Sequence, residues 1–454
     1  MDSSAVLTLW PLSTIGATNS APDGARRVAS MSDDARARVL EQVDDLTDAM
    51  VTELQAVVRI PSISGTADEN TGQSHVASLF SSGGLDVDHW RIDLDEVQGQ
   101  SDFPGMEVHR DEAWGLLGRL AGTGDGASLM LNGHIDVVPQ GDRDAWTDDP
   151  FSGTIRDGNV MGRGTCDMKA GLIACHWAVQ AIRRAGVRLR GDVLVASVQG
   201  EEDGGLGTYS LLRRGWRADA CVIPEPTDLD LVPGNAGALT FRLRVRGHAT
   251  HASRRTAGVS AIEKFWPVWH ALVDLEARRH SDVDPARARF GLTHPLSIGT
   301  IHAGDWASSV PDLLVAEGRL GVALGEHVAD ARLDLERAVA EANERDPWLR
   351  DHPVEVEWWG GQFASGQLPA QSDLLQRVAS AHAVATGGRA QATWVAPYGS
   401  DLRLLTDIGG IPTLQYGPGD VRLAHGPDES VPIADFVVTA RALALLALDV
   451  CGVA

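Results

Sequence analysis

The segment Gly133-His134-Ile135-Asp136 follows the apolar run Leu129-Met130-Leu131 and decides how the rest of the chain is interpreted. A His-x-Asp pair at the end of a strand is typical of a metal site, because residues two apart in an extended chain point the same way. Acidic and histidine residues recur downstream in short motifs: Asp167 in GRGTCD, Glu201 and Glu202 in GEE, Glu225 in PEP, and His425 in AHG. Nitrogen and oxygen donors without clustered cysteines suit two neighbouring divalent metals that activate water. The sequence therefore indicates metal-dependent hydrolysis.

Each strand that we expect in the first half of the chain leads directly toward one of these polar residues. Apolar runs predict buried strands at 128–131, 192–198 and 220–223. Apolar residues at helical spacing over 171–182 lie between the first two strands, which indicates an α/β layer fold. In open α/β sheets, ligands bind at the carboxyl ends of the strands, so we expect the three groups of donors to meet there.

The residue pattern changes near Gly237. Residues 239–245 alternate apolar and polar side chains, as a half-exposed antiparallel strand does. The segments after it are expected to form a helix at 259–279, strands at 296–302 and 313–322, a helix at 328–345 and a strand at 354–358. This β-α-β-β-α-β order predicts an inserted two-layer α+β domain of ferredoxin-like type at 237–358. A strand expected at 411–416 leads toward His425, so the catalytic domain is predicted to be discontinuous, at 33–236 and 359–454.

Composition restricts the class of protein. The 454 residues are enough for two well-buried domains, and the net charge of -23 argues against nucleic acid and anionic membranes as partners. No apolar run approaches the roughly 18–20 residues of a membrane span. The four cysteines form no CxxC pair, which indicates reduced thiols in the cytoplasm. Residues 1–32 lack the basic start of a secretory signal, so we expect a disordered extension and a first helix from about Asp33–Asp34.

The acidic motifs admit a structural role as well as a catalytic one. Glu201 and Glu202 are adjacent and face opposite sides of an extended chain, so one can bind metal while the other faces the attacking water. We assign Glu201 as the general base and Glu202 as the ligand, with a solvated acidic turn as the alternative. Asp167 precedes an expected helix, where an N-cap is the alternative to a carboxylate that bridges two cations. Asp136 is expected to accept the second N–H of His134 or to orient its ring.

Together these motifs resemble the M20 metallopeptidase family, from about residue 40 to 450. The matching segments are GHIDVVP at 133–139, the W-x-x-x-PF segment at 146–151, GRGTCDMKAG at 162–171, GEE at 200–202, PEPT at 224–227, GPG at 417–419 and AHGPDE at 424–429. The deacetylase branch of the family, with acetylornithine deacetylase and succinyl-diaminopimelate desuccinylase, is the most similar. The resemblance implies a mixed-sheet zinc-hydrolase catalytic domain with an inserted dimerisation or lid domain.

The resemblance also implies a set of ligands. His134 and Glu225 are implied to bind one zinc ion, Glu202 and His425 the other, and Asp167 to bridge both. As cofactors we therefore expect two Zn²⁺ ions per subunit, with Co²⁺ or Mn²⁺ as alternatives. Glu201 is implied to be the base, and the peptide bond after Asp167 is implied to be cis. For Glu225 and His425, ordinary loop residues are the alternative reading.

The inserted domain carries two further expectations. Its glycine and histidine motif matches Gly247 and His251, and His251 is implied to cross into a partner's site and stabilise the oxyanion, with an ordinary strand-end histidine as the alternative. Arg319 is implied to bind the substrate carboxylate, with an exposed strand arginine as the alternative. On the catalytic domain, Ser400 matches a loop that holds the substrate. Ser308 stands where the family often has Asn, which leaves the outer substrate contacts open.

We therefore predict a cytoplasmic, homodimeric, dizinc amide hydrolase that removes an N-acyl group from an amino acid or related small amine. A carboxypeptidase or dipeptidase of the same family is the alternative, because the same machinery cleaves a peptide bond. An inactive binding protein of this fold is the distant alternative. The presence of Glu201 and of all five proposed ligands argues against inactivity.

Overall fold

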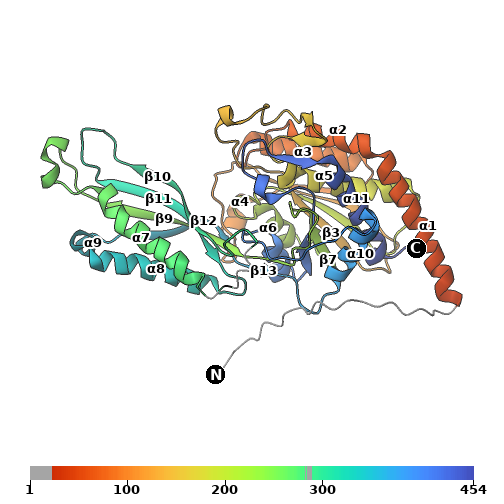
Figure 1. The fold of residues 1–454 in the computed structure, drawn as a ribbon. Coiled ribbons are helices and arrows are strands. Elements are labelled where there is room, and N and C mark those ends of the chain that lie inside the picture. The colour runs from red at the N-terminus through yellow and green to blue at the C-terminus, as the bar shows by residue number, and fades with distance from the viewer. Residues whose placement is uncertain (1–22, 282, 284–288) are drawn as a thin grey trace, which may run out of the picture.

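The computed structural model describes residues 23–281, 283 and 289–454, which form a larger and a smaller lobe (Figure 1). Residues 1–22 of the predicted disordered extension lie outside the described residues. Helix α1 spans Asp23–Asp45, so the first helix begins well before the predicted start at Asp33–Asp34. No helix in the described part of the chain combines the length and apolar character needed to cross a membrane.

The larger lobe is built on a six-stranded sheet with the order β1-β2-β6-β3-β7-β14. Its strands are β1 (Asp86–Arg91), β2 (Trp114–Leu120), β3 (Leu129–His134), β6 (Val193–Val198), β7 (Ala220–Ile223) and β14 (Thr413–Gln415). The four strands from β6 to β14 are parallel, whereas β1 and β2 pair in antiparallel fashion at one edge. The sheet is therefore mixed, and the carboxyl ends of its parallel strands meet at one edge.

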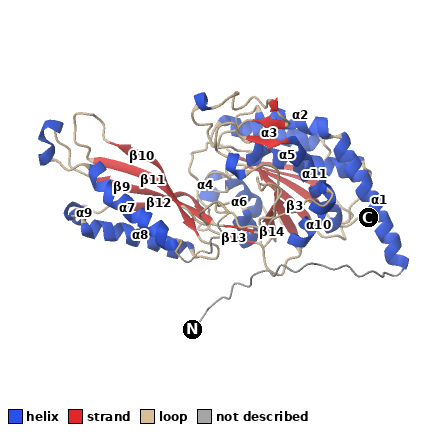
Figure 2. Ribbon diagram, in the orientation of Figure 1, coloured by secondary structure: helices blue, strands red, loops and turns tan. Residues whose placement is uncertain are grey.

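Helices cover both faces of this sheet, as Figure 2 shows. Alternate residues of β3 explain why: Leu129 and Leu131 join one apolar cluster, and Met130 between them joins another. The first cluster contains side chains from six helices on one face of the sheet: α1, α2 (Thr47–Val58), α3 (Ala67–Ser82), α5 (Ala170–Arg184), α10 (Leu374–Thr386) and α11 (Ile433–Cys451). The second cluster, on the other face, contains side chains from α4 (Leu94–Gln98) and α6 (Leu206–Arg213). A strand that is buried on both faces reads as a continuous apolar run, which is why the sequence predicted these strands.

The smaller lobe is a four-stranded antiparallel sheet with the order β10-β11-β9-β12. Its strands are β9 (Gly237–Arg246), β10 (Leu296–Ala303), β11 (Leu313–Val322) and β12 (Glu355–Phe363). Helices α7 (Ala261–Arg279) and α8 (Val328–Arg345) share an apolar core with it, and the short α9 (Pro347–Asp351) follows α8. The β-α-β-β-α-β order agrees with the prediction of a ferredoxin-like two-layer unit.

One strand of this lobe extends well beyond its predicted bounds. Strand β12 continues to Phe363 instead of ending at Trp358, and its pairing with β9 shifts between Trp358 and Gln362. The glycines at 360 and 361 interrupt the apolar alternation there, so the sequence pattern ended early. The remaining strands form two small sheets: β4 (Ile155–Arg156), β5 (Asn159–Met161) and β15 (Ser430–Pro432) in one, β8 (Gly234–Asn235) and β13 (Gly366–Gln367) in the other.

Candidate metal centre and active site

His134 is the last residue of β3 and is almost completely buried. Its Nδ1 donates to the backbone carbonyl of Asp136 at 2.8 Å, because a carbonyl can only accept. Its Nε2 lies 3.1 Å from Oδ1 of Asp167. An unprotonated nitrogen and a carboxylate oxygen at this separation suit two ligands of one cation about 2.0–2.2 Å from each.

Asp136 accepts the second His134 N–H, as expected, but not through its carboxylate. The backbone carbonyl of Asp136 fills that role, and its carboxylate lies 3.8 Å from Nδ1. The carboxylate instead accepts the backbone N–H groups of Glu201 and Glu202, at 3.3 Å each, and the hydroxyl of Ser64 at 2.9 Å. Asp136 therefore positions the turn that carries both glutamates.

Asp167 lies in the irregular turn Thr165–Lys169, ahead of α5. Its φ of -117° and ψ of 93° are not helical, and α5 begins only at Ala170, so Asp167 does not cap this helix. The peptide bond between Asp167 and Met168 is cis, as the family resemblance implies. The Asp167 carboxylate faces both histidines, with Oδ2 at 3.3 Å from Nε2 of His425 in addition to its contact with His134.

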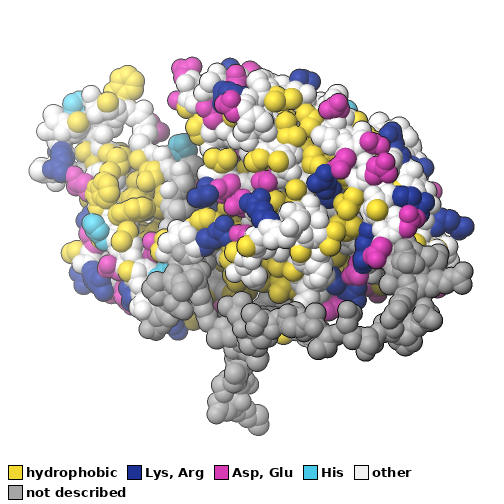
Figure 3. Space-filling view, turned by 45° about the vertical axis from the view of Figure 1, so that its right-hand side comes forward, with side chains coloured by type: hydrophobic (Ala, Val, Ile, Leu, Met, Phe, Trp, Pro, Cys, Tyr) yellow, Lys and Arg dark blue, Asp and Glu magenta, His cyan; other side chains and the backbone are white. Residues whose placement is uncertain are grey.

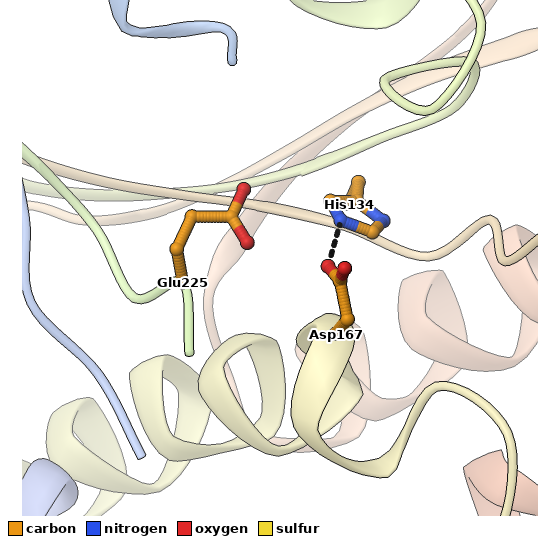
Figure 4. Close-up of side chains that lie close together, drawn as sticks. All are labelled: His134, Asp167 and Glu225. Atoms are coloured by element: carbon orange, nitrogen blue, oxygen red, sulfur yellow. Dashed lines mark hydrogen bonds and ion pairs between the residues drawn. The ribbon is translucent and has the colours of Figure 1, made fainter. Parts of the chain in front are cut away.

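The donor atoms fall into two groups that share Asp167. One group is His134, Asp167 and Glu225, and the other is Asp167, Glu202 and His425; within each, the donor atoms lie within 4.8 Å of one another. Figure 4 shows Glu225 directed toward the space beside the His134 and Asp167 pair. The grouping agrees with the ligand sets that the resemblance implies. The roles of these residues as ligands stay a prediction.

Two local features bring the later ligands to the centre. Glu225 follows β7, and a Cβ on Gly171 of α5 would fall 2.0 Å from the carbonyl oxygen of Pro224, so glycine allows the helix to approach this loop. His425 adopts a left-handed φ of 62°, which is uncommon outside glycine. Its side chain is 52% exposed, whereas that of His134 is 1% exposed. The centre therefore opens to solvent on the His425 side.

The charge of the centre fits divalent cations. Burial raises the pKa of Glu201 well above its usual range, and the nearby carboxylates add to this effect against the opposing charge of His134. Burial and Asp167 likewise raise the pKa of Glu225. The negative charge of Glu202 raises the pKa of His425 to about 11. Burial is the largest cause of the two glutamate shifts, and the neighbouring carboxylates add to it. Two divalent cations would balance the negative charge gathered here.

A cavity of about 320 Å³ lies at this centre. Its walls come from both lobes. On the larger lobe the lining residues include Asp167, Glu201, Glu202, Glu225, Tyr398, Gly399 and His425, and on the smaller lobe they include Ala238, Ser297, Arg319 and Phe363. A volume of this size suits a small molecule that the two lobes enclose.

Comparison with known proteins identifies the family. Residues 130–449, more than half of the chain, match Peptidase family M20/M25/M40. The chain belongs to this family. The prediction made from the seven motifs and their order is thereby confirmed.

M20 relatives with curated names extend over nearly the whole chain. N-formyl-4-amino-5-aminomethyl-2-methylpyrimidine deformylase of Halalkalibacterium halodurans is 28% identical over 445 residues, which cover 91% of this chain and 97% of the relative. Succinyl-diaminopimelate desuccinylase of Gluconacetobacter diazotrophicus is 30% identical and covers 84% and 91%. The structure of human carnosine dipeptidase 1 superposes with a TM-score of 0.72 at 16% identity, covering 92% of this chain and 99% of the dipeptidase. At this identity the superposition shows a common fold.

The three residues expected at the substrate side of this M20 centre lie in different settings. Arg319 lines the cavity. Ser400 is buried and is not among the described lining residues; its hydroxyl accepts from Nε2 of Gln415 at 2.7 Å and lies 3.2 Å from Oδ1 of Asn235. His251 is exposed beside η3 (Ala252–Ala257) and does not line the described cavity of its own chain. Substrate contact by Ser400 and the crossing role of His251 stay predictions.

Two residues near this M20 centre were missed from the sequence. Glu429, fully buried, accepts the backbone N–H groups of Cys166 and Asp167 at 3.1 and 3.2 Å, and its other oxygen pairs with Arg163 at 2.5 Å. It therefore positions the Asp167 turn, although only its place in AHGPDE could have drawn attention to it. Tyr398 lines the cavity, and its hydroxyl has no hydrogen-bond partner among the described residues.

Tyr398 is suited to donate a hydrogen bond. Burial raises the pKa of its phenol well above the usual range, and the charges of Glu225 and Asp167 raise it further. The phenol therefore keeps its proton beside a cluster of carboxylates. A protonated donor that is free in the cavity suits a substrate oxygen.

Proposed function

We propose that this chain is a dizinc amide hydrolase that removes an N-acyl group from a small amine. The observation that carries the proposal is the arrangement of two donor groups around a common Asp167, with Glu201 in the same cavity. The names of the relatives, which include a deformylase, an acetylornithine deacetylase and a desuccinylase, support an acyl-amine substrate.

The residues of the centre would hold two divalent cations. His134 and Glu225 would hold one, Glu202 and His425 the other, and Asp167 both. Zinc suits this mixture of imidazole and carboxylate donors, with Co²⁺ or Mn²⁺ as alternatives. When bound, such cations polarise a substrate carbonyl and make water more acidic.

Proton transfer is the task of Glu201 in this proposal. Its carboxylate takes a proton from the attacking water as the new C–O bond forms, and delivers it to the nitrogen as the C–N bond breaks. The products are a carboxylic acid and a free amine. Asp136 keeps Glu201 and Glu202 in place through their backbone N–H groups, so it is a positioning residue.

The structure gives two features that support a homodimer formed by residues 237–358. Strand β10 lies at the edge of the smaller sheet and pairs on one side only among the described strands, and an exposed edge strand is a template for pairing with a second copy. Apolar side chains gather over this lobe in Figure 3, and Trp266 on α7 and Trp306 after β10 are 54% and 75% exposed. We also propose the cytoplasm as the compartment, because all four cysteines are buried and free.

Mixed dimers test whether His251 completes a partner's site. We expect the Glu201→Gln and His251→Ala homodimers each to be strongly impaired. A hybrid of the two chains contains one complete site, since the chain with intact Glu201 receives His251 from its partner. Activity should therefore return when the two purified variants are unfolded together and refolded. Absence of any recovery, with hybrid formation verified by mass spectrometry, would count against the crossing histidine.

A substrate panel tests the proposed function itself. The zinc-loaded protein should hydrolyse N-formyl, N-acetyl or N-succinyl amines faster than dipeptides, as measured by release of the free amine. Values of kcat/KM above about 10⁴ M⁻¹s⁻¹ would mark a physiological class of substrate. Faster hydrolysis of dipeptides would favour the peptidase alternative. Inactivity on the whole panel would contradict the proposal.

A further inference from the structure

Glu107 connects the two lobes at the rim of the cavity. It lies in the loop between α4 and β2 of the larger lobe, but its side chain reaches three of the four strands of the smaller sheet. Oε1 accepts from Oγ1 of Thr240 at 2.6 Å, from Nη2 of Arg319 at 3.1 Å and from the backbone N–H of Gly361 at 3.4 Å. These donors belong to β9, β11 and β12, so three strands fix one carboxylate oxygen.

The backbone of Glu107 is held as firmly as its side chain. The N–H groups of Glu107 and Val108 donate to Oδ2 of Asp203 at 3.1 and 3.0 Å, and the same oxygen pairs with buried Arg110 at 2.9 Å. Asp203 directly follows the proposed ligand Glu202. The loop that carries Glu107 is therefore anchored to the turn that carries Glu201 and Glu202.

A glycine makes room for the Glu107 side chain. Gly360 has a φ of 62°, and a Cβ at this position would fall 2.4 Å from Cγ of Glu107. Both the backbone conformation and the available space therefore require glycine. The placement of Glu107 against β12 is thus built into the smaller lobe and does not depend on a mobile surface side chain.

The position of Glu107 changes what Arg319 can bind. Nη2 of Arg319 donates to Glu107 and, at 3.3 Å, to the backbone carbonyl of Glu202, and its guanidinium lies 5.7 Å from the ring centre of Phe363. Among the described residues that line the cavity, Arg319 is the only lysine or arginine. A substrate carboxylate that approached this guanidinium would meet the negative charge of Glu107 beside it.

We propose that Glu107 neutralises Arg319 and thereby selects acylated amines that carry no carboxylate over the corresponding N-acyl amino acids. The inference rests on the proposed amide hydrolysis and names the class of amine. It reverses the sequence-based expectation that Arg319 captures a substrate carboxylate. The Arg319–Glu107 pair then joins the two lobes. The Arg319 nitrogens that have no partner among the described residues remain available to neutral oxygen acceptors.

Matched substrate pairs test the inference. Each pair compares an acylated amino acid with the same acylated amine lacking the carboxylate. The pairs are the N-formyl and N-acetyl derivatives of phenylalanine and phenethylamine, of histidine and histamine, and of ornithine and putrescine. The wild-type protein should show a kcat/KM at least about tenfold higher for the member without a carboxylate. Glu107→Gln preserves the shape and an acceptor for Thr240 but removes the charge, so it should shift the ratio of kcat/KM values toward the amino acid by roughly tenfold.

Two control variants test whether this shift arises from the contact between Glu107 and Arg319. Glu112→Gln removes an equal charge from the same loop, where the carboxylate lies 3.8 Å from Arg91 rather than beside Arg319, and should leave the ratio as in the wild type. Adding Arg319→Ala to Glu107→Gln should abolish the gain, because the released guanidinium is what binds the carboxylate. A gain that persists in the double variant would overturn the inference.

Binding separates failure of the inference from failure of the proposed function. Zinc-loaded Glu201→Gln protein, with and without Glu107→Gln, is titrated calorimetrically with the same pairs, so the preference is read without turnover. A wild-type preference for the amino acid derivatives, or an identical ratio with and without Glu107→Gln, would overturn the inference even if amides are hydrolysed. Absence of turnover on all pairs would instead contradict the proposed function, and the binding ratio would still decide the inference.

Discussion

Glu201→Gln is expected to lower kcat on the best acyl-amine substrate by a factor on the order of 10²–10⁴ while both metals stay bound. Glutamine has the same shape but cannot accept the proton of the attacking water. Glu201 is 8% exposed, lines the cavity and belongs to neither of the two donor groups. Its backbone contact with Asp136 does not involve the changed atoms, so the turn should keep its position.

The neighbouring residue provides the matched control. Glu202→Gln makes the same chemical change one residue later, in a side chain that lies 3.2 Å from His425 and belongs to a donor group. We expect this variant to lose metal as well as activity. Metal content by plasma mass spectrometry, measured beside kcat, therefore separates base from ligand. Wild-type turnover by Glu201→Gln would show that another group accepts the proton.

Asp167→Asn is expected to reduce bound metal below two ions per chain and to lower activity by about a thousandfold or more, since several kcal/mol of charge stabilisation depend on the cations. A carboxylate can give one anionic oxygen to each cation, whereas an amide has a single neutral oxygen. Oδ1 and Oδ2 of Asp167 lie 3.1 and 3.3 Å from the two histidines, so both oxygens are in use. Replacement therefore affects both donor groups at once.

His134→Asn serves as the comparison for Asp167→Asn. His134 belongs to one donor group only, so its loss should remove one ion and leave the second group, Asp167, Glu202 and His425, intact. Titration of each metal-free variant with zinc in a calorimeter gives the number of sites. Two tight sites in Asp167→Asn would contradict the bridging role.

The parts of the site that follow strands were predictable from the sequence. Apolar runs locate β3, β6 and β7, and the rule that ligands gather at the carboxyl ends of parallel strands brings His134, Glu202 and Glu225 together. The order of elements in the smaller lobe was equally clear, because its strands and helices have distinct periods of 2 and 3.6 residues. These features depend on local patterns, which a single sequence contains.

The missed features depend on contacts between distant segments. Glu107, Asp203 and Glu429 act through backbone N–H groups of residues far away in the chain, and such contacts leave no periodic signal. Asp136 was expected to act through its carboxylate on His134, but the carbonyl took that contact and released the carboxylate for the Glu201 turn. Which of two acceptors in one residue is used depends on the path of the backbone, which the sequence does not give.

The most direct test of the paired metal centre is a crystal structure of the zinc-loaded protein with anomalous differences recorded above the zinc absorption edge. Two peaks are expected per chain, one contacted by His134 and Glu225 and the other by Glu202 and His425, with one oxygen of Asp167 bound to each. A single peak, or peaks that do not touch Asp167, would contradict a two-metal centre and the hydrolytic mechanism built on it.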